Sequence, residues 1–372
     1  MTATETATER PLVSVIVPAR NEEASLGACL ESLTAQTGLP FEIIVVDDHS
    51  TDRTREIASS FPNVRILDAG PLPEGWTGKN NAVTTGARAA RGDWLLFTDA
   101  DTVHLPGSLA RALAEAQQHG ADLLSYSPEQ IAITFWEMAT LPVVFAELAR
   151  QYPPAKVSDP DSPIAAANGQ FILIRRDAYD AVGGHAAFAT DLLEDVALAR
   201  AVKRSGRTIR FRYAADAVRT RMYRDFSQLR EGWTKNLALL FPQPGWLAVK
   251  TLFWWTFALC LLFLPALIGI GAGLTRNVPW LASAQNTFLT GASILKTWWL
   301  VWMTMTFFAL CRNIVLVQRA NVSVIMESRG VLFGMPMFAY LLFRSKRAHA
   351  NGSIAWKDRT YSDKAGLLAT GH

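Results

Sequence analysis

Cysteine and charge are both scarce in this chain of 372 residues. The three cysteines, Cys29, Cys260 and Cys311, have no metal-ligand spacing, and the last two lie inside apolar stretches. They are typical of packing residues in a reducing compartment, which excludes a disulfide scaffold. Charged residues make up 19% of the chain, against roughly 25% in an ordinary soluble protein, so part of the chain is expected to avoid water.

A nucleic-acid-binding surface and a secretory leader are missing as well. The net charge is only +3, and no run of lysine and arginine alternates with aromatic residues, which excludes a nucleic-acid partner. The segment Met1–Arg10 is polar and rich in threonine, and it lacks the apolar centre of a signal peptide. We therefore expect residues 1–10 to be a disordered tail and the domain that follows to stay in the cytosol.

What the sequence does contain changes near residue 242. Up to that point, short runs rich in Val, Ile and Leu alternate with helical patterns, and the runs lack the polar alternation of half-exposed strands. The predicted strands are Leu12–Val17, Glu42–Val46, Val64–Leu67 and Trp94–Thr98, and the predicted helices between them are Glu22–Ala35, Thr51–Ser60 and Asn80–Ala90. This alternation predicts an α/β domain over residues 11–240, with a mostly parallel sheet and helices on both faces.

Long apolar segments follow the change. Residues 247–274 and 294–317 each exceed the roughly 20 residues that a helix needs to cross a bilayer core, whereas a third segment, 322–343, is only a partial span. Basic residues follow the third segment, so the positive-inside tendency places the tail, residues 344–372, in the cytosol. We predict two full spans in a C-terminal helical membrane region, and a multi-pass protein of the cell (inner) membrane with a cytosolic catalytic domain.

Acidic and amide side chains stand where three of the predicted strands end. The strand ends carry Pro18-Ala-Arg-Asn-Glu22, Asp47-Asp-His-Ser-Thr-Asp52 and Thr98-Asp-Ala-Asp101. Ligands of open α/β sheets bind beyond the carboxyl ends of the strands, so these groups are expected to share one site. An Asp-x-Asp sequence alone is more often a turn with solvated acids. Beside two further acid clusters, Asp99 and Asp101 are candidate ligands of Mg²⁺ or Mn²⁺, which bind carboxylate and phosphate oxygens.

These three motifs, in this order, resemble the family 2 glycosyltransferases, whose fold is GT-A, the nucleotide-diphospho-sugar transferase fold. The resemblance covers about residues 11–240. It implies that Asp48 contacts the nucleobase and that Asp99 and Asp101 meet the ribose and the metal-bound diphosphate. It also places Pro18, Arg20 and Glu22 along the nucleotide.

Two further segments resemble members of the family that act on lipids. Gly75-Trp-Thr-Gly-Lys-Asn80 is similar to a segment of transferases that glycosylate isoprenoid lipids, such as carotenoid and hopanoid-associated enzymes. A lysine before a helix start is placed to meet phosphate, so we include Lys79 in the nucleotide-sugar site. The tail segment Trp356-Lys-Asp-Arg-Thr-Tyr361 is similar to an ending of lipid-directed members, with Asp358 where they carry glycine.

The catalytic base is predicted from the pair Glu194-Asp195 at the start of the helical pattern Val196–Ser205. Acids at a helix start are ordinarily no more than favourable with the helix dipole. The resemblance implies that Asp195 is the general base of an inverting enzyme, and Glu194 beside it is the second candidate catalytic residue. It also implies that the segment Asn168-Gly169-Gln170 lies on the acceptor side.

One motif departs from the family pattern. Processive polysaccharide synthases of this family carry Gln-x-x-Arg-Trp, whereas this chain has Gln228-Leu-Arg-Glu-Gly-Trp233. The departure weakens a polymer-synthase interpretation and leaves Arg230 and Trp233 as candidate residues on the acceptor side.

Taken together, these residues predict an enzyme that moves a sugar from a nucleoside diphosphate, with UDP favoured, to a membrane lipid, possible acceptors including isoprenoid lipids. The expected cofactor is Mg²⁺ or Mn²⁺, and the resemblance implies an inverting displacement. The sequence leaves a processive polysaccharide synthase and a catalytically inactive membrane scaffold open as alternatives. A nucleotidyltransferase is disfavoured because its usual glycine-rich opening loop is absent.

Overall fold

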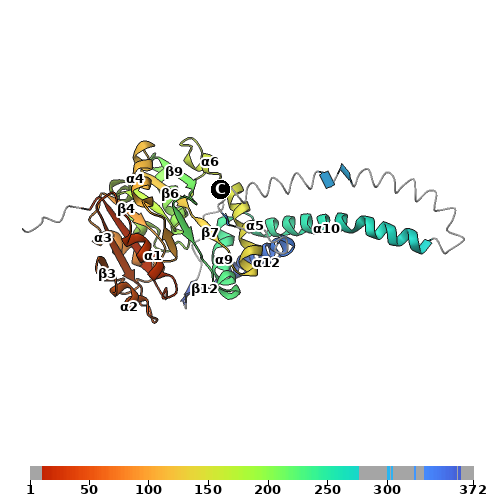
Figure 1. Cartoon of the computed structure of the whole chain (residues 1–372), viewed down its shortest axis with the longest axis horizontal. Coiled ribbons are helices and arrows are strands. Elements are labelled where there is room, and N and C mark those ends of the chain that lie inside the picture. The colour runs from red at the N-terminus through yellow and green to blue at the C-terminus, as the bar shows by residue number, and fades with distance from the viewer. Residues whose placement is uncertain are drawn as a thin grey trace, which may run out of the picture.

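The computed structural model describes residues 11–275, 300–301, 303–304, 322–323, 331–357 and 359–361. Its centre is a seven-stranded sheet with the order β3-β2-β1-β4-β8-β6-β9 (Figure 1). The strands are β1 (Val13–Ala19), β2 (Phe41–Asp47), β3 (Val64–Asp68), β4 (Trp94–Phe97), β6 (Leu123–Ser127), β8 (Ile172–Arg175) and β9 (Ile209–Tyr213). Strand β8 is antiparallel to both β4 and β6, and the other pairings are parallel.

Both faces of this sheet are covered, which explains why its strands lack polar alternation. In β1, Val15 and Val17 belong to one hydrophobic core, and Ile16 between them belongs to the other. The first core is closed by α1 (Leu26–Thr34), α2 (Thr54–Ser59) and α4 (Ser108–Gln118), and the second by α3 (Gly78–Ala89), α7 (Arg176–Ala181) and α8 (Glu194–Arg204). The prediction of an α/β domain with a mostly parallel sheet is confirmed.

The strand order brings the polar strand ends to one edge of the sheet. Strand β1 lies between β2 and β4, and Ala19 at its end pairs with Asp47 at the end of β2. The chain turns sharply after both strands, because Asn21 and His49 adopt the left-handed conformation, with φ values of 52° and 58°. Such conformations are uncommon for residues other than glycine and are concentrated at functional sites.

A smaller sheet extends this edge. It consists of β11 (Val322–Ser323), β7 (Glu129–Ile131), β10 (Val218–Thr220) and β5 (Thr102–His104), in that order. Strand β5 begins immediately after Asp101, and the hydroxyl group of Thr220 in β10 donates a hydrogen bond to the carbonyl oxygen of Asp101 at 3.2 Å. The small sheet therefore fixes the backbone of the Asp-x-Asp motif.

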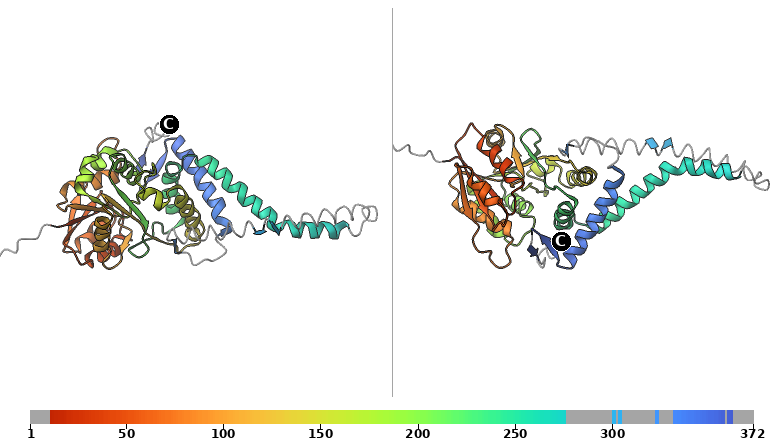
Figure 2. Two further views of the ribbon diagram at one scale, coloured as in Figure 1. Left: turned by 90° about the horizontal axis from the view of Figure 1, so that it is seen from above. Right: turned by 60° about the horizontal axis from the view of Figure 1, so that its bottom comes forward.

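A third hydrophobic core lies beside the sheets and is built from helices. It joins α5 (Phe135–Gln151), α9 (Phe226–Leu240) and α12 (Val331–Ala350). Phe145 of α5, Trp233 of α9 and Phe338 of α12 are buried in it. Helix α10 (Pro244–Thr275) starts against this group and then extends away from the body of the molecule (Figures 1 and 2).

The predicted membrane region is not supported. Residues 247–274 lie in α10, and most of 294–317 falls outside the described residues. The third segment contains β11 and the first part of α12, which packs against α5 and α9. Throughout the part of the chain that the structure describes, no helix has both the length and the apolar character needed to traverse a bilayer. Residues 344–350, expected to begin a separate tail, continue α12.

The contact between α12 and α5 depends on one glycine. A Cβ atom at Gly334 would overlap with the carbonyl oxygen of Ala139 and lie 2.9 Å from the side chain of Val143. Because a backbone oxygen cannot move aside, Gly334→Ala is expected to lower the free energy of unfolding by about 1–3 kcal/mol, measured by chemical denaturation followed by circular dichroism.

The matched control is Gly27→Ala. Gly27 lies in α1, and the nearest atom to an added Cβ would be 3.8 Å away, at ordinary contact distance. This change is expected to be neutral or to stabilise the protein by up to about 1 kcal/mol. Equal stability of the two variants would show that the close approach of α12 to α5 is wrong.

Candidate active site

A cavity of about 550 Å³ lies at the carboxyl edge of the large sheet, between the ends of β1, β2 and β4 and helices α5, α8 and α9. It is large enough for a ligand of several chemical groups. Of the residues that the sequence singles out, those that line it are Pro18, Arg20, Glu22, Asp48, Lys79, Asp99, Asp101, Asn168, Gly169, Gln170, Glu194, Asp195 and Trp233. The strand-end motifs therefore share one site with the Glu-Asp pair.

Arg230 is the exception. Its guanidinium carbon lies 5.9 Å from the ring centre of Phe226, one turn earlier on α9, and Arg230 does not line the cavity. The face of α9 toward the cavity carries Trp233 and Asn236 instead. The phase of the helix turns Arg230 onto another face, so the structure does not bring it together with the other predicted site residues.

Lys79 connects two of the acidic motifs. Helix α3 begins at Gly78, one residue earlier than the lysine, so Lys79 lies in its first turn. The ammonium nitrogen is 2.7 Å from a carboxylate oxygen of Asp99 and 2.8 Å from one of Glu194. Burial by itself would lower the pKa of Lys79, but the two carboxylates outweigh it and raise the pKa well above its usual value. The two carboxylates therefore favour the charged form of this ammonium group in the site.

Asp195 is held in place by the backbone. One of its oxygens accepts a hydrogen bond from the N–H of Gly169 at 3.0 Å, and the other accepts from the N–H of Val196 at 2.8 Å. Burial, together with the adjacent charge of Glu194, raises the pKa of Asp195 to about 6. A carboxylate with a pKa close to the working pH is suited to accept a proton during a reaction.

The segment Asn168–Gln170 is held in place by hydrogen bonds to neighbouring strands. The backbone N–H of Asn168 donates to the hydroxyl of Ser125 at 2.8 Å, and the side chain of Gln170 is bonded to those of Gln130 and Thr220. An added Cβ at Gly169 would lie 3.2 Å from the ammonium nitrogen of Lys79. The glycine therefore leaves room for the lysine next to Asp195.

Asp101 is the group in this site that fits a cation. Within the described residues, its Oδ1 atom is buried and has no hydrogen-bond partner. Burial, and next the charge of Asp99, raise the pKa of Asp101 to about 7, so an added positive charge would be favourable here. The structure shows no group of three or more metal-ligating side chains among its described residues. A cation here would rely on Asp99, Asp101 and oxygen atoms of a bound ligand, as Mg²⁺ commonly does.

The end of the cavity next to β1 and β2 contains ion pairs that the sequence did not indicate. Arg20 donates to the carbonyl oxygen of Asp48 at 2.8 Å. The carboxylate of Asp48 pairs with Arg359, and that of Glu22 pairs with Lys357. Both cations come from the hairpin of β12 (Ile354–Trp356) and β13 (Arg359–Tyr361).

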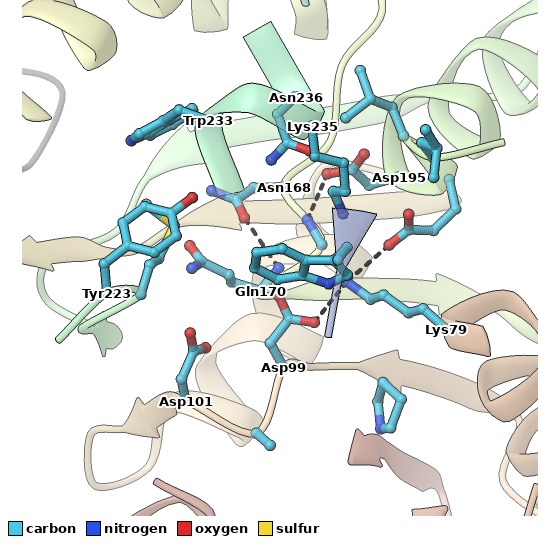
Figure 3. A pocket seen from close by; sticks show the side chains of 18 of the residues that line it. Lys79, Asp99, Asp101, Asn168, Gln170, Asp195, Tyr223, Trp233, Lys235 and Asn236 are labelled. Atoms are coloured by element: carbon cyan, nitrogen blue, oxygen red, sulfur yellow. Dashed lines mark hydrogen bonds and ion pairs between the residues drawn. The ribbon is translucent and has the colours of Figure 1, made fainter. Parts of the chain in front are cut away.

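A third cation, Lys235, was also missed. It projects from α9, and its ammonium nitrogen lies 5.0 Å from the ring centre of Trp356 in the hairpin. Burial lowers the pKa of Lys235 in spite of the nearby charge of Glu194. In Figure 3, Trp233, Lys235 and Asn236 of α9 lie at the top of the view, and Asp99 and Asp101 of the Asp-x-Asp motif lie lower in it.

The signals for these cations differ. The segment Trp356–Tyr361 has a pattern similar to that of lipid-directed members, but this similarity does not indicate that the segment lies in the site. Nothing in the pattern around Lys235 distinguishes it from a solvated helix lysine.

Comparison with known proteins identifies glycosyltransferases of Staphylococcus aureus as relatives. The chain is 29% identical, over 235 residues, to 4,4'-diaponeurosporenoate glycosyltransferase of Staphylococcus aureus strain USA300, and 30% identical to that of strain MRSA252. Each alignment covers 61% of this chain and 60% of the relative, so the match spans less than two thirds of the relatives' length.

Solved structures give weaker likenesses. The mannosyltransferase PcManGT from Pyrobaculum calidifontis, in complex with GDP-Man and Mn²⁺, aligns over 92% of this chain and 87% of its own, with 18% identity and a TM-score of 0.49. S. aureus TarS 1-349, in complex with UDP-GlcNAc, aligns over 64% of this chain and 66% of its own, with 19% identity and a TM-score of 0.41. At the level of sequence, residues 14–183 match Glycosyl transferase family 2. The matched region covers less than half of the chain.

Proposed function

We propose that this protein transfers one sugar from a nucleoside-diphosphate sugar to a lipid acceptor at a membrane surface. The observation that carries the proposal is the grouping of Asp48, Asp99, Asp101 and Asp195 around Lys79 in one cavity at the carboxyl edge of the sheet. The position of these acids and the sheet order support the GT-A fold that the sequence resemblance implies. UDP is the favoured nucleotide on the same resemblance.

The residues of the site suit a displacement at the anomeric carbon. Departure of the nucleoside diphosphate leaves negative charge on its phosphate oxygens, and the ammonium group of Lys79 lies where it can compensate that charge. Asp195 takes the proton of an attacking hydroxyl group, since two backbone N–H groups hold its carboxylate at the acceptor-side segment Asn168–Gln170. Attack from the face opposite the leaving group inverts the anomeric configuration.

A divalent cation, Mg²⁺ or Mn²⁺, completes the donor site in this proposal. Asp99 and Asp101 are the residues that would hold it, and the Oδ1 atom of Asp101, which has no hydrogen-bond partner among the described residues, supports this choice. When bound, such an ion neutralises charge on the leaving diphosphate.

An apolar acceptor is supported by the cavity wall that α5 and α9 form and by exposed apolar side chains on α5, α10 and α12. Phe145, Leu148 and Leu240 line the cavity on the side of α5 and α9. Large apolar side chains are exposed nearby on α5, α10 and α12; they include Phe135, Trp246, Phe253, Trp254 and Phe333. An exposed apolar surface of this kind is typical of a site that contacts lipid. We propose that it rests on the cytosolic face of the cell membrane.

The acceptor class is a further part of the proposal. The relatives are named for diaponeurosporenoate, a carotenoid-type compound whose name denotes a carboxylate. A carboxylate attacks without losing a proton, whereas a hydroxyl group needs the base. We propose an isoprenoid-type lipid as the acceptor of this protein.

The test is to incubate the full chain with individual nucleoside-diphosphate sugars, Mn²⁺ and a membrane lipid extract, and to identify the products by mass spectrometry. We expect release of the nucleoside diphosphate and a lipid heavier by one sugar, both lost when EDTA removes the cation. A ladder of products would instead support a processive synthase. Absence of both product and nucleotide binding would support an inactive scaffold.

A further inference from the structure

The hairpin of β12 and β13 forms one wall of the donor side of the cavity. It follows α12, more than 300 residues after β1 and β2, yet Trp356, Lys357 and Arg359 line the same cavity as the strand-end motifs. The proposed function does not use any of these residues.

The two cations of the hairpin contact the two strand-end segments directly. The guanidinium of Arg359 spans the carboxylate of Asp48, with N–O distances of 2.5 and 2.9 Å. The ammonium of Lys357 contacts the carboxylate of Glu22 and donates to the carbonyl oxygen of Arg20 at 2.9 Å. In return, Arg20 donates to the carbonyl oxygen of Lys357 at 3.2 Å. The side chain of Asp48 is only 5% exposed, so its negative charge is compensated chiefly by the hairpin.

Contacts with α9 hold the hairpin in place on its other side. The backbone N–H of Lys357 donates to the carboxylate of Glu231 in α9 at 3.1 Å, and Trp356 lies under the ammonium of Lys235. Lys357 itself has a φ of 47°, in the left-handed region. A residue other than glycine keeps such a conformation where its surroundings impose it. The hairpin is therefore fastened across the cavity between α9 and the strand ends.

Gly78 makes room for the guanidinium group. A Cβ atom at this position would overlap with the terminal nitrogen of Arg359 and with the carboxylate of Asp48. Gly78 is the first residue of α3 and precedes Lys79. Arg359 therefore lies next to the lysine that the proposed function assigns to the diphosphate.

The charge balance of the cavity explains why a donor site needs these two cations. Among the residues that the structure describes, seven acidic and seven basic ones line it, and two of the basic ones belong to the hairpin. Without the hairpin, five basic residues would face seven acidic ones, and a diphosphate would enter a cavity of its own sign. The planar guanidinium of arginine binds phosphate as well as carboxylate through two parallel hydrogen bonds.

We propose that Arg359 and Lys357 are donor-binding residues. When a nucleoside-diphosphate sugar enters, the guanidinium of Arg359 releases the carboxylate of Asp48 and binds oxygen atoms of the diphosphate instead. The carboxylate of Asp48 then binds the nucleoside. Lys357 closes the same side of the cavity over Glu22. This inference rests on the proposed function, since it concerns the binding of the same donor.

The test is isothermal titration calorimetry of the full chain with UDP in the presence of Mn²⁺, with GDP in parallel and with uridine and guanosine as ligands that lack the diphosphate. Arg359→Ala is expected to weaken nucleoside-diphosphate binding about 10- to 100-fold, as loss of a charge-assisted, two-pronged contact does. Affinity for the nucleoside is expected to be unchanged or higher. Arg359→Lys, which keeps the charge and loses the fork, is expected to show a smaller loss.

The matched control is Arg347→Ala, because Arg347 is exposed on α12 and does not line the cavity. It is expected to bind nucleoside diphosphates like the wild type. Lys357→Gln provides a second variant in case Arg359→Ala does not fold, as judged by its melting temperature, and a loss of at least about fivefold is expected for it.

Two negative results have different meanings. If the wild type binds UDP or GDP and the Arg359 variants bind equally well or more tightly, the hairpin is a plug over Asp48 and the inference is wrong while the proposed function stands. If the wild type binds neither nucleoside diphosphate, the proposed function fails, and the inference fails with it.

Discussion

Replacement of Asp195 by asparagine is expected to lower the rate of nucleoside-diphosphate release, with water as the acceptor, by about 10²- to 10⁴-fold, the usual contribution of a general base. Asparagine has nearly the same shape and can still accept a backbone N–H, but it cannot take a proton. Water is a suitable acceptor for this measurement because, like any hydroxyl group, it must lose a proton when it attacks. Release of the nucleotide is followed by a coupled phosphate assay.

The pH dependence of the wild type provides an independent check. Burial raises the pKa of Asp195 to about 6, so the base is protonated and inactive below that pH. The rate with water is expected to rise about tenfold per pH unit up to roughly pH 6 and then to level off. With a carboxylate acceptor, both this dependence and the effect of the asparagine variant are expected to be much smaller, because no proton is removed.

Asp180→Asn is the matched control, since Asp180 is exposed in α7 and does not line the cavity. It is expected to keep the full rate. An Asp195→Asn protein that is folded and releases nucleotide at the wild-type rate would remove Asp195 from the mechanism.

Asp101→Asn is expected to weaken binding of Mn²⁺ with the nucleoside diphosphate by at least about 100-fold, because even residues that only support metal ligands typically contribute about 10- to 100-fold. The substitution keeps the size of the side chain and removes the charge of a group whose Oδ1 atom is buried and finds no partner in the described part of the chain. Sugar transfer is expected to fall with it. Titration of the cation at a fixed nucleotide concentration measures the change.

The fold should survive this substitution. The backbone of Asp101 is held by Thr220, and burial already raises the pKa of its carboxyl group toward the neutral form that asparagine imitates. Asp161→Asn, an exposed aspartate outside the cavity, is the control. Unchanged cation dependence in a folded Asp101→Asn protein would overturn the assignment of a cation to Asp99 and Asp101.

Much of the α/β domain could be predicted because its information is local. Runs such as Glu42–Val46 lack polar alternation, and β2 is indeed buried on both faces. Parallel strands joined by helices end at one edge, so the convergence of Asp48 and Asp99 on one cavity also followed from the pattern. Helix starts were less exact, as the predicted start at Glu22 and the observed start of α1 at Leu26 show.

The environment of the apolar C-terminal segments could not be predicted in the same way. An apolar segment such as Gly330–Phe343 has the same composition whether it contacts lipid or packs against other helices. In the structure, Phe338, Leu341 and Leu342 of α12 are buried against α5 and α9. The composition of such a segment indicates that it is removed from water. The elements that pack against it determine whether lipid or other helices cover it.

The sequence by itself determined the sheet, its covered faces and the edge at which the acids gather, because these depend on side-chain periods of a few residues. The tertiary structure alone decided which cations complete the site. Arg359 reaches Asp48 across 311 positions of the chain, and Lys235 faces the cavity while Arg230 does not. Such contacts depend on how separate elements pack and on the rotational phase of a helix, and neither is encoded in any short stretch of residues.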